Sequence, residues 1–233
     1  MVFKHRRHRV LSAAVTATFL ANLVSFVPAP ADFPGALDSE EPLIAAYVVG
    51  ADGTPIPLDE VPFKSEDAPS EGPSISPYLL DFGQWVSCIQ IGNENDVFMN
   101  YQFAKDGQIQ DVRLKCGNDY YGYRHIKKKH ETDWNKLMTA GEALGWVPES
   151  QGIESWDDLM AQSAGMVLFG WQNTGYNPGN SKRCAIAKVQ WYRMDTFQVV
   201  LSKRIIVVFA TDSDRLITAY PPKDQNTQTC YPS

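Results

Sequence analysis

The sequence predicts an α+β fold in which two helices pack on antiparallel β-meander sheets. Three strand-like runs come first in the globular part of the chain, two helix-like runs follow, and three more strand-like runs end it. Strands and helices that are segregated in this way are typical of the α+β class. From residue 76 onward the composition is rich in Trp, Tyr, Phe and Val, and roughly 150 such residues suffice for one hydrophobic core. We therefore expect one folded domain over residues 76–233.

The first 31 residues have the pattern of a removable secretory leader. Four basic residues lie among the first nine, the run 10–27 is apolar, and Ala29-Pro30-Ala31 is a small-x-small cleavage signal. An uncleaved membrane anchor is the alternative, because the apolar run is about as long as a short spanning helix. No second run is long and apolar enough to cross a bilayer. We expect a secreted, extracellular protein with no membrane partner once the leader is removed.

Residues 32–75 form an acidic segment rich in Pro and Ser, which we interpret as a mostly disordered linker or pro-segment. It contains ten acidic residues and one basic residue, Lys64, so its net charge is −9. Without the leader the chain has 17 basic and 27 acidic residues, a net charge of −10, so the remaining domain is close to neutral. The segment could therefore mask a basic surface of the domain.

The first half of the domain is expected to hold three strands and a helix. The strands are predicted at residues 85–91, 97–103 and 109–116, and Lys105-Asp106-Gly107 is a glycine-containing hairpin turn between the last two. A helix is predicted over residues 124–139 and should end at Gly141.

A second helix is predicted over residues 156–169, where apolar residues recur at helical spacing after a cap at Ser155 or Glu154. The loop 170–180 is rich in Asn and Gly, and it either lines a substrate groove or simply connects two elements. Strands are then predicted at residues 185–192, 197–209 and 215–220.

Alternation along the last strand places Thr218 and Tyr220 on one face. If the preceding turn has about four residues, Thr218 lies opposite Val207 and Tyr220 opposite Ile205, which would bring Lys203 to the same face. A similar turn before that would add Lys188, opposite Leu201. The assignment is conditional, because a change of one residue in either turn reverses the faces. Each of these residues also has a purely structural reading as an ordinary strand residue.

Four cysteines follow the leader, an even number that suits two disulfides in an oxidising compartment: Cys88, Cys116, Cys184 and Cys230. None belongs to a CxxC pair, so we expect no zinc site. Three connectivities are open, although the pairs Cys88–Cys116 and Cys184–Cys230 would each cross-link one half of the domain. Free buried thiols are the alternative.

The stretch 118–130 holds both histidines that follow the leader, together with three lysines, one arginine and three tyrosines. Imidazoles titrate near neutral pH, so His125 and His130 among fixed cations suit acid–base cleavage of a phosphodiester. The alternative is a solvated basic helix. The two histidines are five residues apart, which on an ideal helix separates them by about 140°. Both could reach one phosphate if one lies at the helix mouth, where Gly122 gives the backbone freedom.

The segment Gly122-Tyr123-Arg124-His125-Ile126 with His130, followed by a meander and by Leu216-Ile217-Thr218-Ala219-Tyr220-Pro221, resembles the EndoU and barnase-like ribonucleases, the BECR fold. The resemblance covers residues 115–222 and rests on an HIxxxH and a TxYP motif. This group includes many secreted bacterial toxins.

The resemblance implies a toxin-like, metal-independent endoribonuclease in which the ribose 2′-hydroxyl attacks the adjacent phosphorus and leaves a 2′,3′-cyclic phosphate. His125 and His130 would be its general base and general acid, in an order left open. Lys188, or otherwise Lys203, would stabilise the developing charge. Thr218 and Tyr220 would orient the phosphate or stack on a base.

The implied partner is RNA, with single-stranded RNA favoured, and an immunity or inhibitor protein is a further candidate partner. Arg124, Lys129 and Lys203 are the candidate substrate-binding cations. No Rossmann, P-loop, zinc or EF-hand pattern is present, so no cofactor or metal is expected. Two other functions stay open. The chain could be a secreted binding module of the cell surface, which the net charge of −10 favours, or it could keep the fold of the group without its activity.

Overall fold

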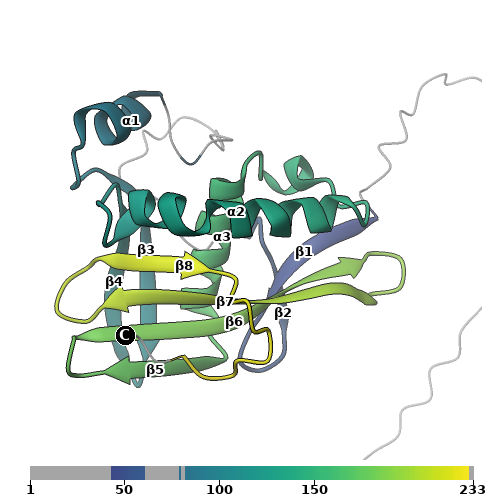
Figure 1. The fold of residues 1–233 in the computed structure, drawn as a ribbon. Helices are drawn as coiled ribbons and strands as arrows, with labels where there is room; N and C mark the ends of the chain where they lie inside the picture. The colour runs from purple at the N-terminus through teal and green to yellow at the C-terminus, as the bar shows by residue number, and fades with distance from the viewer. Residues whose placement is uncertain (1–42, 61–78, 80–81, 231–233) are drawn as a thin grey trace, which may run out of the picture. The chain divides into compact units, whose positions relative to one another are not determined.

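A computed structural model of the protein describes residues 43–60, 79 and 82–230. All of them belong to one compact unit, Glu40–Ser233. The predicted leader, residues 1–31, lies outside the described residues, as do residues 32–42 and 61–75 of the predicted linker. The described part combines antiparallel sheets with helices, so the predicted α+β class is confirmed (Figure 1).

The larger sheet has six antiparallel strands in the order β2-β1-β6-β7-β8, and β5 pairs with the free part of β6. Its strands are β1 (Ile44–Val49), β2 (Pro55–Pro57), β5 (Asn173–Asn177), β6 (Lys182–Arg193), β7 (Val199–Ala210) and β8 (Leu216–Tyr220). The three predicted C-terminal strands correspond to β6, β7 and β8. In Figure 1 the yellow strand β8 lies at the edge of this sheet, below helix α2.

A separate hairpin is formed by β3 (Val97–Lys105) and β4 (Gln108–Lys115), as predicted. Its two-residue turn has positive φ at Asp106 (52°) and at Gly107 (75°). An Asp-Gly pair with positive φ at both positions is the preferred two-residue connection of a hairpin, because its twist matches the twist of the strands.

Helices α2 (Gly122–Glu142) and α3 (Trp156–Phe169) confirm the two predicted helices. Ser155 caps α3 by accepting a hydrogen bond from the Asp158 backbone, while Asp158 accepts one from the Ser155 backbone. Eleven residues of α3 are buried, because the helix packs against β3 on one side and against β6 and β7 on the other. Helix α2 packs against β8 and α3. A short 3-10 helix, η2 (Pro148–Gln151), lies between them.

The strand predicted at residues 85–91 is wrong, because this segment is helical. It consists of α1 (Phe82–Trp85) and the continuous π-helical turn η1 (Val86–Ile91). Its β-branched residues suggested a strand, but Cys88 alone is buried and its apolar neighbours are exposed. A strand would have needed a partner, whereas this segment is fixed to the domain through Cys88.

The prediction that residues 32–75 are a disordered linker is wrong for the part that the structure describes. Strand β1 pairs with the outer half of β6, from Ile44 opposite Arg193 to Val49 opposite Lys188. Ala46 is fully buried, and its backbone NH and carbonyl both bond to the Gln151 side chain. The domain therefore begins before residue 76, because β5 pairs only with the first part of β6 and β1 covers the rest of that edge.

The register predicted for β8 is wrong by one residue. Thr218 lies opposite Val208 and Tyr220 opposite Ile206, with an irregularity between Val208 and Phe209. The turn 211–215 has five residues instead of the assumed four, so even-numbered residues of β7 share the face of Tyr220.

This register decides the positions of the two candidate lysines. Lys188 lies opposite Arg204, so it is on the face of Tyr220 as predicted, although Leu201 is not its partner. Lys203 lies opposite the buried Val189 and is therefore on the other face, which contradicts the prediction that it joins Thr218 and Tyr220.

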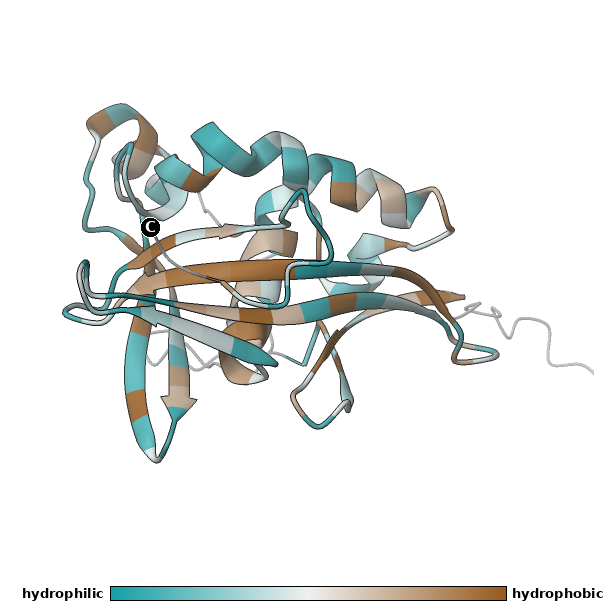
Figure 2. Cartoon of the chain, turned by 60° about the horizontal axis from the view of Figure 1, so that its bottom comes forward, coloured by the Kyte–Doolittle hydropathy of each residue, from teal (hydrophilic) through white to brown (hydrophobic). Residues whose placement is uncertain are grey.

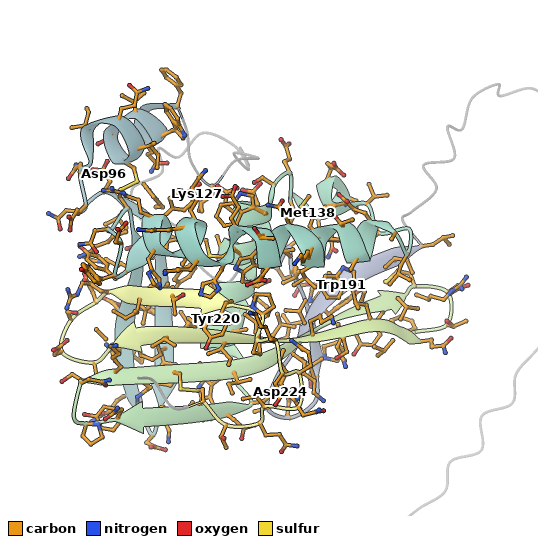
Figure 3. The ribbon with its side chains drawn as sticks, viewed as in Figure 1. Asp96, Lys127, Met138, Trp191, Tyr220 and Asp224 are labelled. Atoms are coloured by element: carbon orange, nitrogen blue, oxygen red, sulfur yellow. A yellow bond between two sulfur atoms is a disulfide. The ribbon has the colours of Figure 1, made fainter. Side chains whose placement is uncertain are left out.

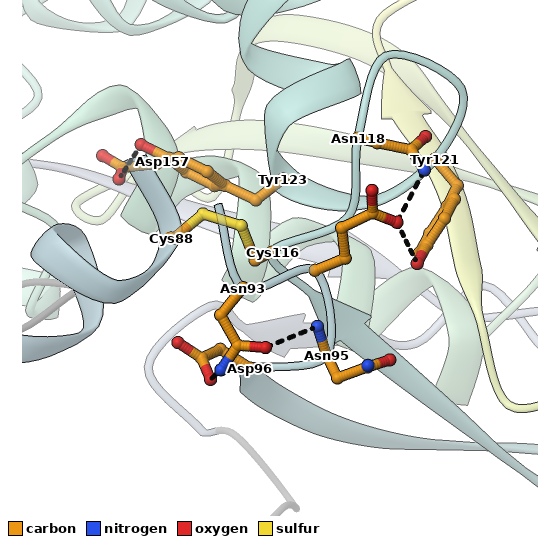
Figure 4. Close-up of a disulfide and its surroundings, with 10 residues drawn as sticks. Cys88, Asn93, Asn95, Asp96, Cys116, Asn118, Tyr121, Tyr123 and Asp157 are labelled. Atoms are coloured by element: carbon orange, nitrogen blue, oxygen red, sulfur yellow. Dashed lines mark hydrogen bonds between the residues drawn. A yellow bond between two sulfur atoms is a disulfide. The ribbon is translucent and has the colours of Figure 1, made fainter. Parts of the chain in front are cut away.

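Two disulfides are present, Cys88–Cys116 and Cys184–Cys230, and no described cysteine is free. The first fixes η1 to the end of β4, and Figure 4 shows it beside Tyr123, which donates a hydrogen bond to Asp157. The second holds the C-terminal segment against β6. These are the two pairings that each cross-link one half of the domain.

Helix α2 is fixed to the edge of the large sheet by Trp134. Its side chain is fully buried, and Nε1 donates a 3.0 Å hydrogen bond to the Ala219 carbonyl of β8. An edge strand has backbone NH and carbonyl groups without strand partners on its outer side. Burying such a group without a hydrogen bond costs free energy, and a donor from the covering helix avoids that cost. This contact sets the distance between the histidine-bearing helix and the strand of Thr218 and Tyr220.

Replacing Trp134 with Phe should lower the free energy of unfolding by about 1–3 kcal/mol, because the Ala219 carbonyl loses its donor in a buried place. Unfolding by urea with the disulfides intact measures this. Trp85→Phe is the matched control, since Trp85 is partly exposed on α1, and it should change stability by less than about 0.5 kcal/mol. Equal losses for the two variants would contradict the role given to Trp134.

Candidate functional site

The loop before α2 is built on two glycines. A Cβ on Gly117 would lie 2.0 Å from the Tyr121 carbonyl oxygen, and a Cβ on Gly122 would lie 2.6 Å from the Lys115 carbonyl oxygen. Both residues have positive φ, 63° and 78°, which glycine adopts without strain. Asn118 NH donates to the Tyr121 carbonyl and closes the turn. The loop therefore folds back tightly against the first turn of α2.

His125 lies in that first turn and is oriented by the loop. Its Nδ1 is 2.7 Å from the Asp119 carbonyl oxygen. A carbonyl only accepts hydrogen bonds, so Nδ1 carries the proton and Nε2 is the position at which the neutral ring accepts a proton. The Asp119 carboxylate pairs with Lys128 at 2.6 Å, and this bond holds the pKa of Asp119 below its ordinary value.

His130 is held between α2 and the sheet. Its ring stacks on Tyr220 of β8, with centroids 4.7 Å apart and planes 13° apart. Only 21% of the side chain is exposed, and this burial lowers the pKa of His130, against the smaller opposing effect of Asp133. Nδ1 lies 3.5 Å from the Asp133 carboxylate, too far for a normal hydrogen bond. Near neutral pH the ring is therefore uncharged.

The two imidazoles come together although they are five residues apart on one helix. Their ring centroids are 6.3 Å apart, because both side chains lean toward the flank of α2 that faces β8. The expectation that one histidine lies near the helix mouth agrees with the position of His125, four residues into α2.

A pocket of about 520 Å³ opens beside His125. Thr218 and Tyr220 line it from β8, Lys182 from β6, and Asp224 from the C-terminal segment. Figure 3 labels Tyr220 at the end of β8 and Asp224 in the segment that follows. The Thr218 side chain is 9% exposed, and its Oγ1 has no hydrogen-bond partner among the described residues. A buried hydroxyl without a partner, in the wall of a pocket, is a position where a bound ligand would complete the hydrogen bonding.

Burial raises the pKa of Tyr220, so its hydroxyl stays protonated at neutral pH. His130 covers one face of the Tyr220 ring. The stack favours a role for Tyr220 in orienting His130 over a role in stacking on a base.

His130 does not itself line this pocket and meets it through the Tyr220 ring on which it stacks. The other predicted residues also lie outside the pocket. Lys188 shares the sheet face of Tyr220 but does not line the pocket, and Lys203 lies on the other face. Arg124 and Lys129 line a neighbouring shallow pocket on α2. The loop 170–180 contains β5, and none of its residues lines the histidine pocket.

Lys182, Tyr120 and Asp224 line the pocket and were not predicted. Lys182 lies an even number of residues from Lys188 on β6, so the two share a face of the sheet. A predicted strand that began three residues earlier, at 182, would have included it. Tyr120 belongs to the stretch 118–130, whose sequence gives its tyrosines no specific role. Asp224 had no signal, because its segment is brought back over the sheet by distant contacts, the Cys184–Cys230 bond and the hydrogen bonds from Arg204 to Gln225.

No protein-family model matches the chain, and neither a curated protein nor a solved structure matches it. The resemblance to EndoU-like ribonucleases therefore rests on the two short motifs. Among the described residues, no group of three or more His, Cys, Asp or Glu side chains is arranged to hold a metal ion, and no helix is long and apolar enough to cross a membrane.

Replacing His130 with Gln should reduce the loss of stability on acidification. In the unfolded chain a histidine binds a proton near pH 6.5. Burial lowers the pKa of His130 in the folded chain, so the unfolded chain binds this proton more readily. The stability linked to His130 is therefore present above about pH 6.5 and is lost as the pH falls. The stability advantage of the unaltered chain over His130→Gln should therefore shrink between about pH 7.5 and about pH 5. Urea unfolding of both chains at each pH measures this, and a constant difference would contradict a lowered pKa.

Proposed function

We propose that the protein is a secreted, metal-independent endoribonuclease that acts by attack of the ribose 2′-hydroxyl on the adjacent phosphorus. The observation that carries this proposal is the pair of imidazoles 6.3 Å apart, of which His125 lines a pocket that also holds a threonine hydroxyl without a partner among the described residues. Acid–base cleavage of RNA needs one group that takes a proton and one that gives a proton on the two sides of a phosphate. We assign these two tasks to His125 and His130.

The environments of the two rings suggest their order. Burial keeps His130 neutral, which is the form a general base needs, so His130 takes the proton of the 2′-hydroxyl. His125 is more accessible, and its protonated Nδ1 already bonds to the Asp119 carbonyl, so its cationic form suits the general acid. As the bond from the 2′-oxygen to phosphorus forms and the bond to the 5′-oxygen breaks, His125 gives its proton to the departing 5′-oxygen. The products are a 2′,3′-cyclic phosphate and a 5′-hydroxyl.

The charge that develops on the phosphate oxygens needs a cation and hydrogen-bond donors. Lys182 and Thr218 line the pocket and take these roles, in place of Lys188 or Lys203. Tyr220 positions His130 through the ring stack. Arg124 and Lys129, on the same helix as His125, would contact phosphates further along a single strand.

Secretion is supported by the leader pattern and by the two disulfides, which persist in oxidising compartments. The toxin-like role is part of the same proposal and rests on the motif resemblance alone.

A non-catalytic binding module of the cell surface is the second candidate. Asp224 in the pocket wall favours it, because a carboxylate opposes the binding of a phosphate. The net charge of −10 after the leader points the same way. In this case the pocket would bind a neutral or cationic group.

The residues from 32 onward, with both disulfides formed, should cleave single-stranded RNA in EDTA and leave 2′,3′-cyclic phosphate ends. His125→Ala and His130→Ala should each lower the rate by about a hundredfold or more, because each removes one proton transfer. Gel analysis of end-labelled RNA, with chemical identification of the new ends, measures both effects.

Asn135→Ala is the control for this experiment, because Asn135 is exposed on the same helix and its side chain bonds only to the Glu131 carbonyl. It should cleave RNA like the unaltered chain. A chain that is folded but cleaves no RNA would overturn the proposal and favour the binding module. Cleavage that survives in both histidine variants would place the chemistry elsewhere.

A further inference from the structure

A second surface, on the segment 82–91, exposes apolar side chains. Large parts of Phe82 (82%) and Ile91 (75%) are accessible to solvent, and Trp85 and Ile89 are exposed to about 38% and 37%. Positions 82, 85 and 89 follow helical spacing and form one side of the segment, whereas Cys88 is buried. We call Phe82, Trp85, Ile89 and Ile91 the apolar stripe. Figure 2 shows brown turns in this segment beside the teal start of α2.

Cations of α2 border the apolar stripe. Ile89 lines a shallow pocket of about 430 Å³ with four cations, Arg124, Lys127, Lys128 and Lys129, and with two acids, Asp119 and Glu131. Lys128 pairs with Asp119, while no ion pair among the described residues uses the other three. Figure 3 shows Lys127 on the side of α2 turned toward α1. The Cys88–Cys116 disulfide fixes η1 close to the start of α2, so the stripe and the cations form one surface.

We propose that this surface docks the protein on a bilayer that contains anionic phospholipids. Aromatic and aliphatic side chains enter the boundary between headgroups and acyl chains, and basic side chains next to them contact the phosphates of anionic lipids. Exposed apolar residues, three of them on one side of the segment, lie beside cations, and these are the two features that such binding requires. Docking of this kind needs no membrane-crossing helix.

Two other occupants fit the surface less well. Nucleic acid would use the cations, and a base could stack on Phe82 or Trp85, but it would leave the aliphatic Ile89 and Ile91 without a partner. A second copy related by a two-fold axis would bring the same cations of both copies together, and these would repel each other. Anionic lipid is complementary to both the apolar and the charged part.

Vesicle co-sedimentation tests the proposal on residues 32–233, because the apolar run of the leader would itself bind lipid. The protein should sediment with vesicles of phosphatidylcholine mixed with phosphatidylglycerol, and binding should fall by at least about tenfold in the double variant Phe82→Ser with Ile91→Ser. The matched control is Phe197→Ser with Ile109→Ser, since these residues are similarly exposed (69% and 68%) on other parts of the domain, and it should bind like the unaltered chain.

The charge contribution is tested by Lys127→Glu, which should lower binding to the mixed vesicles by at least about tenfold. Lys136→Glu, at an exposed position further along α2, is its control and should have little effect. Equal binding to vesicles of phosphatidylcholine alone, equal losses in a variant and its control, or no sedimentation of the unaltered chain would each overturn the proposal. Self-association that the stripe variant abolishes, without vesicle binding, would assign the surface to a second copy and overturn it as well.

Discussion

The docking of helix α2 on the edge strand β8 is the constraint on which the candidate site depends. Trp134 reaches from the middle of the helix to the Ala219 carbonyl and satisfies a backbone group that an edge strand leaves open. Ala219 lies between Thr218 and Tyr220, so the bond fixes the helix at the strand residues that line the pocket. One turn before Trp134, His130 meets Tyr220 ring to ring. The site is therefore a consequence of how the helix covers the strand.

The start of α2 adds the second histidine to this arrangement. Gly117 and Gly122 allow the loop to fold back until the Asp119 carbonyl accepts a hydrogen bond from His125 Nδ1. The helix thus presents one imidazole that is oriented by a backbone carbonyl and one that is partly buried under a tyrosine. Burial lowers the pKa of His130, so this ring stays in the neutral form that a general base needs.

Features that depend on local sequence were predictable. Helix α3 follows from its cap and its apolar spacing, the β3–β4 hairpin follows from Asp106-Gly107, and alternation alone places Thr218 and Tyr220 on one face. Features that depend on distant parts of the chain were not. The five-residue turn before β8 shifted the register and moved Lys203 to the other face, since the parity of a turn has no local signal. Strand β1 was missed because its six apolar residues lie within an acidic, proline-rich segment. Asp224 was missed because the Cys184–Cys230 bond and the hydrogen bonds from Arg204 to Gln225 hold its segment over the sheet, and neither has a local signal.

The central claim is that His125 and His130 act on one bound phosphate. Titration of the folded chain with a 3′-mononucleotide, followed by the nuclear magnetic resonance signals of the two imidazoles, tests it most directly. The account predicts that both signals shift together along one saturation curve and that Thr218→Val weakens the binding, because the hydroxyl that completes the site is lost. A shift of only one imidazole, or of neither, would contradict it.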